Sequence, residues 1–342
     1  MKKASFFSKI MLFLNMIFSF CLLIACIVPY TSSASLAFIG LGVPLLVGIN
    51  LLFFLYWLVR RRYYFLLSLS ILIYGYMSLG TFIGFNNAGT SVEIEESLSI
   101  MSFNSLGFRG KEDEWTSTAG DTIVKFIKKE GPEIVCFQEF DYKKIRSNYF
   151  KEYPYKYVDF EFGPNSGRMI QAVYSKYKIV NKGILEFTES SNSAIFVDIK
   201  YKKDTLRIYN LHLESLNIRP NNIKKERSDK LFARLRNSFA KQQEQSQIVK
   251  NHMISSPFKN IVCGDFNNTQ FSNSYFTIKG DLKDSFLEKG SGYGETITFL
   301  KFPFRIDMIL VDPSLEITSH KNYDIQLSDH EPILATIKIP SE

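Results

Sequence analysis

Acidic residues are absent from the first 92 positions of this 342-residue chain, and Glu93 is the first carboxylate. The basic residues of that segment form two small groups: Lys2, Lys3 and Lys9, then Arg60, Arg61 and Arg62. Without these six, the chain holds 35 basic and 34 acidic residues, so the net charge of +7 comes from its first quarter. That location excludes a general polyanion-binding role for the charge and favours a membrane-topology signal.

Charge of either sign is absent from Ile10 to Val59, and this apolar stretch is interrupted only by "PYTSSAS" at residues 29–35. Each half is long enough to supply the ~20 residues that a helix needs to cross the hydrocarbon core of a bilayer. A third apolar run extends from about Tyr63 to Phe85. We therefore expect residues 1–85 to form a membrane anchor of three transmembrane helices.

The positive residues predict how this anchor is oriented. They lie before the first helix and between the second and third, so the positive-inside rule puts both places in the cytoplasm. Three crossings then predict a multi-pass protein of the cell (inner) membrane, with everything after Gly84 outside the cytoplasm. A cleaved signal peptide would not be followed by two more apolar runs. The sequence "LIAC" (23–26) resembles a lipoprotein processing box, but the apolar "IVPY" follows it instead of a polar tether.

Cysteine is scarce, and several catalytic motifs are missing. Two of the four cysteines lie in the first apolar run, and Cys136 and Cys263 lie in strand-like runs that predict small core residues rather than a disulfide framework. The chain has no H-E-x-x-H, G-x-S-x-G or Walker loop. These absences argue against zinc proteases, serine hydrolases and P-loop nucleotide hydrolases.

After a short polar linker at residues 86–96, strand and helix patterns alternate through residues 97–342. Apolar strands are expected at 98–105 and 134–140, and a hairpin turning at Lys202 to Asp204. Helices are expected from residue 119 to a stop at Gly131-Pro132, and at about 222–253. Strands outnumber helices, which predicts an α/β domain of about 250 residues with more sheet than a doubly wound fold.

Hard polar side chains follow these strands at the points where they end. They are Asn104, Glu139, His212, Asp265, Asn267, Asp307, Asp329 and His330. Rigid strands can hold such a set in one precise arrangement. Carboxylate and amide oxygens without cysteine suit Mg²⁺, or Mn²⁺, rather than zinc.

Six motifs in order carry a resemblance to a known family: "MSFNS", "CFQEF", "YNLHLES", "CGDFNN", "RIDMILV" and "LSDHEPI". Together they resemble the endonuclease/exonuclease/phosphatase family, which is similar to deoxyribonuclease I and includes nucleases, sphingomyelinases and inositol-phosphate phosphatases. The resemblance covers about residues 97–340. It implies a four-layer sandwich of two mixed β-sheets flanked by helices, and the metal-dependent hydrolysis of a phosphate ester.

The resemblance also implies a role for each matching residue. Glu139 would bind the metal, with Asn104 beside it and Asp329 nearby.

The remaining matches would carry the reaction. Asp265 would orient and deprotonate the attacking water, and Asn267 would hold a phosphate oxygen. His330, paired with Asp307, would donate to the scissile phosphate, and His212 would contact the phosphate or assist the leaving group.

Structural alternatives exist for several of these residues. Asp265 and Asn267 could form an Asx turn that ends a strand, His212 could be a satisfied sheet histidine, and Asp307 could pair with Arg305. Arg168 is a candidate substrate-binding residue.

The substrate is left open between a lipid head group, a nucleotide and a nucleic acid, and the sequence implies no protein partner. Residues 219–241 carry eight basic and two acidic side chains, which fit a solvated helix face better than an anion-binding surface. Phosphodiester hydrolysis is the first expectation. The alternatives are a phosphomonoesterase acting on lipid head groups or sugar phosphates, and a non-catalytic membrane-anchored binding protein.

Overall fold

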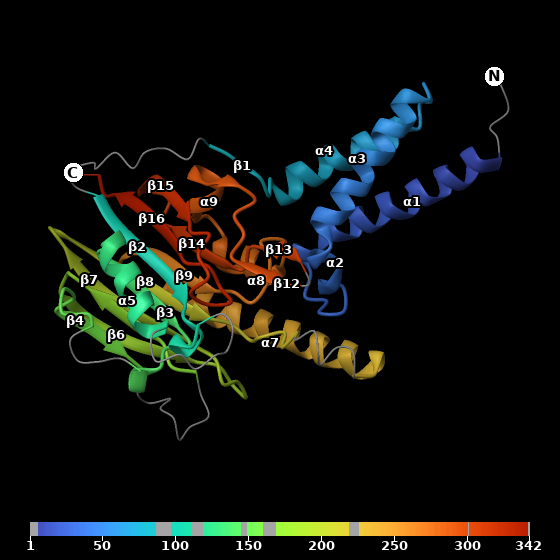
Figure 1. Cartoon of the computed structure of the whole chain (residues 1–342). Helices are drawn as coiled ribbons and strands as arrows, with labels where there is room; N and C mark the ends of the chain where they lie inside the picture. The colour runs from blue at the N-terminus through green and yellow to red at the C-terminus, as the bar shows by residue number, and fades with distance from the viewer. Residues whose placement is uncertain are drawn as a thin grey trace.

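The computed structural model describes residues 6–86, 97–110, 119–144, 149–159, 169–218, 226–299 and 301–340. Two parts are evident in Figure 1: a bundle of N-terminal helices and a β-sandwich with helices on its outer faces. We call α1 (Phe6–Ile27), η1 (Val28–Tyr30), α2 (Ala37–Leu41), α3 (Val43–Val59) and α4 (Phe65–Leu79) the helical bundle.

Two six-stranded mixed sheets form the sandwich. The first sheet has the order β15-β16-β2-β3-β5-β4 and the second β10-β14-β9-β8-β7-β6. In each sheet one central pair is parallel, β2 with β3 and β8 with β9, and the other pairs are antiparallel. The strands are β2 (Ser97–Asn104), β3 (Ile134–Gln138), β4 (Tyr155–Val158), β5 (Ala172–Ser175), β6 (Ile179–Glu186), β7 (Ser193–Tyr201), β8 (Asp204–His212), β9 (Lys259–Asp265), β10 (Lys283–Asp284), β14 (Asp307–Val311), β15 (Glu316–Asn322) and β16 (Ile333–Lys338).

Alternate residues of the central strands face the two sides of each sheet, and both sides are covered. Ile100 of β2 and Ile261 of β9 meet in the core between the sheets, together with Cys136 and Cys263. Burial on both faces explains why these strands read as unbroken apolar runs. The cysteines are free core residues, as the sequence predicted.

Helices cover the outer faces and complete the four layers (Figure 1). On the first sheet, α5 (Ala119–Glu130) buries Ile123 and Ile127, one helical turn apart. It ends at Gly131, which adopts a positive φ of 63° while its N–H donates to the Ile127 carbonyl. On the second sheet lie α7 (Ser228–Ile254) and α8 (Asn273–Lys279).

Short elements complete the described chain. They are η2 (Leu106–Phe108), η3 (Tyr142–Lys144), α9 (Ser285–Lys289), the pair β1 (Gly84–Phe85) and β11 (Ser291–Gly292), and the hairpin β12 (Ile297–Phe299) and β13 (Phe302–Phe304).

The helical bundle differs from the three long helices that the sequence led us to expect. Within the described residues, one helix, Phe6–Tyr30, is long and apolar enough to cross a membrane, with 25 residues. The second apolar run is divided, because Gly42 and Pro44 separate α2 from α3 and leave α3 with 17 residues. The third run stops at Gly80, whose φ is 75°, so α4 has 15 residues.

The bundle packs directly against the sandwich. Phe271 is buried among Leu22, Val43 and Leu79 of the bundle. Immediately after the bundle, β1 pairs with β11, and the Asn86 side chain donates to the Glu288 carbonyl at 3.0 Å. The rest of the expected linker, residues 87–96, lies outside the described residues.

Candidate active site

Three adjacent strands of the second sheet place three predicted site residues side by side at one edge of the sandwich. His212 ends β8, Asp265 ends β9, and the two are register partners in the parallel ladder. Asp307 begins the antiparallel β14 and is the register partner of Asp265 on its other side. The three side chains therefore lie in a row along one rim of the sandwich.

The first sheet adds its strand ends to the same rim. Asn104 is the last residue of β2, and Glu139 follows the last residue of β3. The Asn104 side-chain amide donates to Asp265 Oδ2 at 3.1 Å and lies 3.4 Å from Glu139 Oε1. This amide therefore joins the two sheets across the site.

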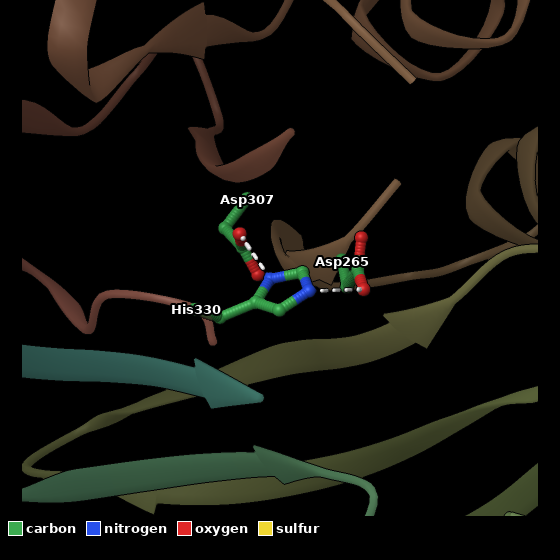
Figure 2. A group of neighbouring side chains, drawn as sticks. All are labelled: Asp265, Asp307 and His330. Atoms are coloured by element: carbon green, nitrogen blue, oxygen red, sulfur yellow. Dashed lines mark hydrogen bonds and ion pairs between the residues drawn. The ribbon is translucent and has the colours of Figure 1, made fainter. Parts of the chain in front are cut away.

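His330 completes the cluster from the segment that leads into β16. Its Nδ1 donates to Asp307 Oδ2 at 2.8 Å, and its Nε2 lies 3.7 Å from Asp265 Oδ2, as Figure 2 shows. His212 Nε2 approaches the same Asp265 oxygen at 3.7 Å and Glu139 Oε1 at 3.8 Å. Asp265 thus lies at the centre of the group.

Burial and neighbouring charges change the pKa of this central carboxylate. Burial is the main cause that raises the pKa of Asp265 to about 6, and the Asp307 carboxylate adds to it, while His330 and His212 oppose it. A carboxylate with a pKa near neutrality can accept a proton and later release it.

The pKa values of the two histidines are shifted in opposite directions. Burial lowers the pKa of both, but at His330 the carboxylates of Asp307 and Asp265 outweigh burial and hold the pKa well above its usual value. At His212 burial prevails, so its pKa is lowered. The site therefore holds an imidazolium at His330 beside a neutral imidazole at His212, a pairing suited to acid–base chemistry.

Asp265 and Asn267 form the Asx turn that we considered as a structural alternative, without leaving the cluster. The Asn267 N–H donates to Asp265 Oδ1 at 2.7 Å, which leaves Oδ2 to face His330 and Asn104. The Asn267 amide donates to the Leu213 carbonyl at 2.9 Å, so it also ties the loop after β9 to the loop after β8. One oxygen of this carboxylate therefore forms the turn that ends the strand, and the other oxygen faces the cluster.

The backbone around the cluster adopts conformations that are unfavourable for most residues. Glu139 and Asn267 both have a φ of 49° in the left-handed region. Asparagine tolerates this region better than glutamate does, so the conformation of Glu139 stores strain of the kind that is concentrated at functional sites. Gly264 has a φ of 137°, and a Cβ there would lie 2.1 Å from the Leu211 carbonyl oxygen. Only glycine lets β8 and β9 approach so closely beside Asp265.

The oxygen atoms near Glu139 suit a divalent cation. Burial raises the pKa of Glu139, the Asp329 carboxylate raises it further, and His330 offsets only part of this effect. Neighbouring carboxylates without full compensation favour a bound cation. Asp265, Asp307 and His330 also have ligand atoms within 4.8 Å of one another. Because Asp307 engages the protonated His330, however, we assign these three residues to acid–base chemistry rather than to a metal.

Other predicted residues lie at the edge of the cluster or outside the described residues, and Asp329 is close enough to Glu139 for its carboxylate to raise the Glu139 pKa. Asp329 is exposed, and its carboxylate Oδ1 lies 3.1 Å from Ser328 Oγ. Arg168 lies outside the described residues. The alternative pairing of Asp307 with Arg305 is wrong, because the buried Arg305 binds Asp284 at 2.9 Å instead.

Several supporting residues escaped the sequence analysis. The Thr296 hydroxyl accepts the Asp307 N–H at 3.1 Å, and Ser328 Oγ donates to the Asn104 carbonyl at 2.8 Å. Gln242 of α7 donates to the Asn267 carbonyl at 3.1 Å. Ser328 belongs to the "LSDHEPI" motif and could have been named, whereas nothing local marks Thr296 or Gln242.

Comparisons with known proteins agree with this architecture. No curated protein matches the chain. Among solved structures, an endonuclease/exonuclease/phosphatase from Bacteroides vulgatus has a TM-score of 0.56 and 18% identity, over 72% of this chain and 100% of that one. TDP2 of D. rerio, in complex with a single-strand DNA product, has a TM-score of 0.54 and 17% identity, over 71% and 99%. The protein from Beutenbergia cavernae DSM 12333 has a TM-score of 0.55 and 13% identity, over 72% of each chain. At these identities the likeness shows the fold.

Family models match two segments of the chain. Residues 8–82 match a domain of unknown function (DUF8431), which corresponds to the helical bundle. Residues 101–330 match the Endonuclease/Exonuclease/phosphatase family, and this match includes every residue of the cluster from Asn104 to His330. The chain belongs to the endonuclease/exonuclease/phosphatase family.

Proposed function

We propose that this protein is a metal-dependent phosphoesterase that hydrolyses phosphodiesters and is anchored in a membrane with its catalytic domain outside the cytoplasm. The observation that carries the proposal is the position of Asp265 Oδ2, which lies within 3.1 to 3.7 Å of Asn104, His212 and His330. These residues come from distant parts of the chain and share one carboxylate oxygen.

The cluster supplies the groups that ester hydrolysis needs. Asp265 orients the attacking water and accepts its proton, which suits a pKa of about 6. The imidazolium of His330, held by Asp307, donates to the scissile phosphate. His212 is neutral and lies on the other side of Asp265, where it contacts the phosphate or assists the leaving group. Such preorganised donors each contribute about 10²–10³ in rate.

Mg²⁺, or Mn²⁺, would be held by Glu139 with Asn104 and Asp329. Glu139 has 24% of its side chain exposed, and Asp329 is exposed, so the ligands open toward solvent and substrate. Such a cation would neutralise charge on the phosphate oxygens when bound. Asn267 is proposed to contribute to phosphate binding through its turn, since its amide already donates to Leu213.

The helical bundle has the surface of a membrane anchor. Large apolar side chains are exposed on all three of its longer helices, for example Phe13, Leu52 and Met77, at 62%, 67% and 78%. Polar side chains are buried instead: Ser19 of α1 donates to Asn50 of α3 at 2.8 Å, and Ser68 of α4 donates to α1. Apolar exterior and hydrogen-bonded polar interior are what a bundle in lipid requires.

The positive residues of the bundle indicate its orientation across the membrane. Its N-terminal end and the loop of Arg60, Arg61 and Arg62 lie at the end away from the sandwich in Figure 1. Positive residues favour the cytoplasmic side, so the sandwich is proposed to lie on the opposite side. We propose that α3 and α4 cross the bilayer beside α1. The 17 residues of α3 reach the lower limit for a span, and local thinning of the bilayer can relieve the hydrophobic mismatch of α4, which has 15 residues.

The test uses the whole chain in detergent, because residues such as Phe271 would lose their apolar partners in an isolated catalytic domain. We expect Mg²⁺-dependent hydrolysis of bis-p-nitrophenyl phosphate that EDTA abolishes, with slower turnover of the monoester p-nitrophenyl phosphate. Asp265→Asn keeps an oxygen for the Asn267 N–H and should fold normally without turnover. A folded variant with full turnover would reject the mechanism.

A further inference from the structure

The two loops that leave the catalytic rim both run into the helical bundle. Six residues after Asp265, Phe271 is 3% exposed and packs among Leu22 and Leu79. Four residues after His212, Leu216 is buried with Ala37 of α2. Six residues span at most about 22 Å, so the candidate active centre lies no farther than that from the core of the bundle.

The contact between bundle and sandwich has several independent points. Aromatic rings meet at 5.5 Å between Tyr30 and Phe276 and at 6.1 Å between Phe82 and Phe271. Hydrogen bonds add to them: the Gln270 amide donates to the Thr81 carbonyl at 2.7 Å, and the Asn273 amide to the Pro29 carbonyl at 2.9 Å.

These contacts fix the position and the orientation of the catalytic rim relative to the helical bundle. The bundle touches the loops after β8 and β9, so the rim that carries the cluster is on the side of the sandwich toward the bundle. In Figure 1, α2 lies at the end of the bundle nearest the sandwich, and α1 runs from there toward the N-terminus. If the bundle spans a bilayer, the rim lies close to the surface of that bilayer.

The start of α7 has the composition of a segment at a lipid–water interface. Phe232 stacks on Phe38 of α2 with ring centroids 4.8 Å apart, yet 46% of it remains exposed. Lys230 and Arg236 of the same helix are exposed. Exposed aromatic and basic side chains next to an apolar bundle suit the head-group region, where basic side chains are attracted to anionic lipids.

We infer that the substrate is a lipid-borne phosphate ester, presented by the leaflet on which the catalytic domain lies. This inference rests on the proposed function and on the membrane anchor. A rim held close to a bilayer meets head groups by lateral diffusion.

The experiment uses the whole chain reconstituted in vesicles with Mg²⁺, and it compares one head group in different physical forms. A long-chain phospholipid is placed either in the same vesicles as the protein or in separate ones. Because a shared membrane raises the effective concentration, we expect hydrolysis at least about tenfold faster in the shared vesicles. A short-chain, water-soluble ester with the same head group and a single-stranded oligonucleotide are run in parallel, and both should be hydrolysed more slowly.

A matched pair of glycine substitutions tests the docking itself. A Cβ at Gly40 would lie 3.2 Å from the Phe271 carbonyl oxygen, so the larger side chain in Gly40→Leu should displace α2 from the loop after β9. A Cβ at Gly48 of α3 would meet nothing within 4 Å, so Gly48→Leu is the control. We expect Gly40→Leu to lower lipid hydrolysis at least about tenfold more than hydrolysis of bis-p-nitrophenyl phosphate, and Gly48→Leu to change neither.

The results separate this inference from the proposed function. Turnover of bis-p-nitrophenyl phosphate without any advantage for the lipid in shared vesicles, or with faster cleavage of the oligonucleotide, would overturn the inference and leave the phosphoesterase in place. Equal losses of both activities in Gly40→Leu would also overturn it. Absence of turnover on every ester would refute the proposed function itself.

Discussion

The pair formed by His330 and Asp307 gives the sharpest test of the catalytic cluster. Asp307→Asn keeps the size and shape of the side chain and removes its charge. The Asn oxygen can still accept from His330 Nδ1, so a buried hydrogen bond of 2.8 Å can persist. What is lost is the main charge that holds the pKa of His330 above its usual value against the effect of burial.

The size of the effect follows from the charges. Opposite unit charges about 4 Å apart interact by about 4 kcal/mol at an effective dielectric of 20. Without the Asp307 charge the pKa of His330 should therefore fall, so that less of the imidazole is protonated on the alkaline side of the pH profile. Loss of the acid form and poorer orientation of the ring should together slow the reaction about 10²–10³-fold.

The assay is the pH dependence of kcat/KM for bis-p-nitrophenyl phosphate. We expect the alkaline limb to move to lower pH in Asp307→Asn, with partial recovery near pH 6, where protonation of Asp265 limits the rate. Asp198→Asn is the matched control, because Asp198 is also buried and paired, with Arg207 at 2.6 Å, but lies outside the cluster. An alkaline limb that stays in place in Asp307→Asn, with kcat within about twofold of the native value, would refute the assigned role.

Further predictions concern the other groups of the site and the orientation of the chain. For the native protein, kcat/KM should rise with pH through about 6, because Asp265 must lose its proton to act as a base; a flat profile from pH 4 to 8 would contradict this. Glu139→Gln should weaken Mg²⁺ activation about 10–100-fold and be rescued by excess Mg²⁺ in an activity titration. Gly264→Ala should destabilise the fold by more than about 3 kcal/mol in thermal or denaturant unfolding, since its Cβ would lie 2.1 Å from a backbone oxygen. In intact cells, an impermeant thiol reagent should label Lys203→Cys on the exposed β7–β8 turn but not Tyr63→Cys beside the arginine loop, and the reverse pattern would place the catalytic domain in the cytoplasm.

Much of the catalytic rim follows from local sequence because strand ends are easy to recognise. Ile261, Val262 and Cys263 predict a buried strand, and the polar residues after them mark its end. Pairing of distant ends, such as Asp265 with His212, is not visible locally, and only the resemblance of the ordered motifs implied it. The two mixed sheets flanked by helices agree with that resemblance.

Other features depend on tertiary structure and could not be derived. An apolar run of the right length predicted a long second helix, but Gly42 and Pro44 start a new helix within it. Charge pairing was equally hidden: Arg305 is only two residues from Asp307, yet it lies between β13 and β14, and its guanidinium binds the distant Asp284. Asp265 was weighed as either turn residue or base, whereas the two oxygens of one carboxylate allow both.

The segment from Asp265 to Asn273 links catalysis to anchoring within nine residues. Its start supplies the proposed base, its middle buries Phe271 in the bundle, and Gln270 holds both the Thr81 carbonyl and the guanidinium of Arg305. Arg305 in turn begins the short segment that leads to Asp307 in β14. A shift of the bundle relative to the sandwich must therefore move this loop or break these bonds, and either change reaches Asp265 or Asp307 through fewer than seven residues. On this reasoning the anchor is part of the scaffold of the active site, and removing residues 1–86 should cost activity even where the sandwich still folds.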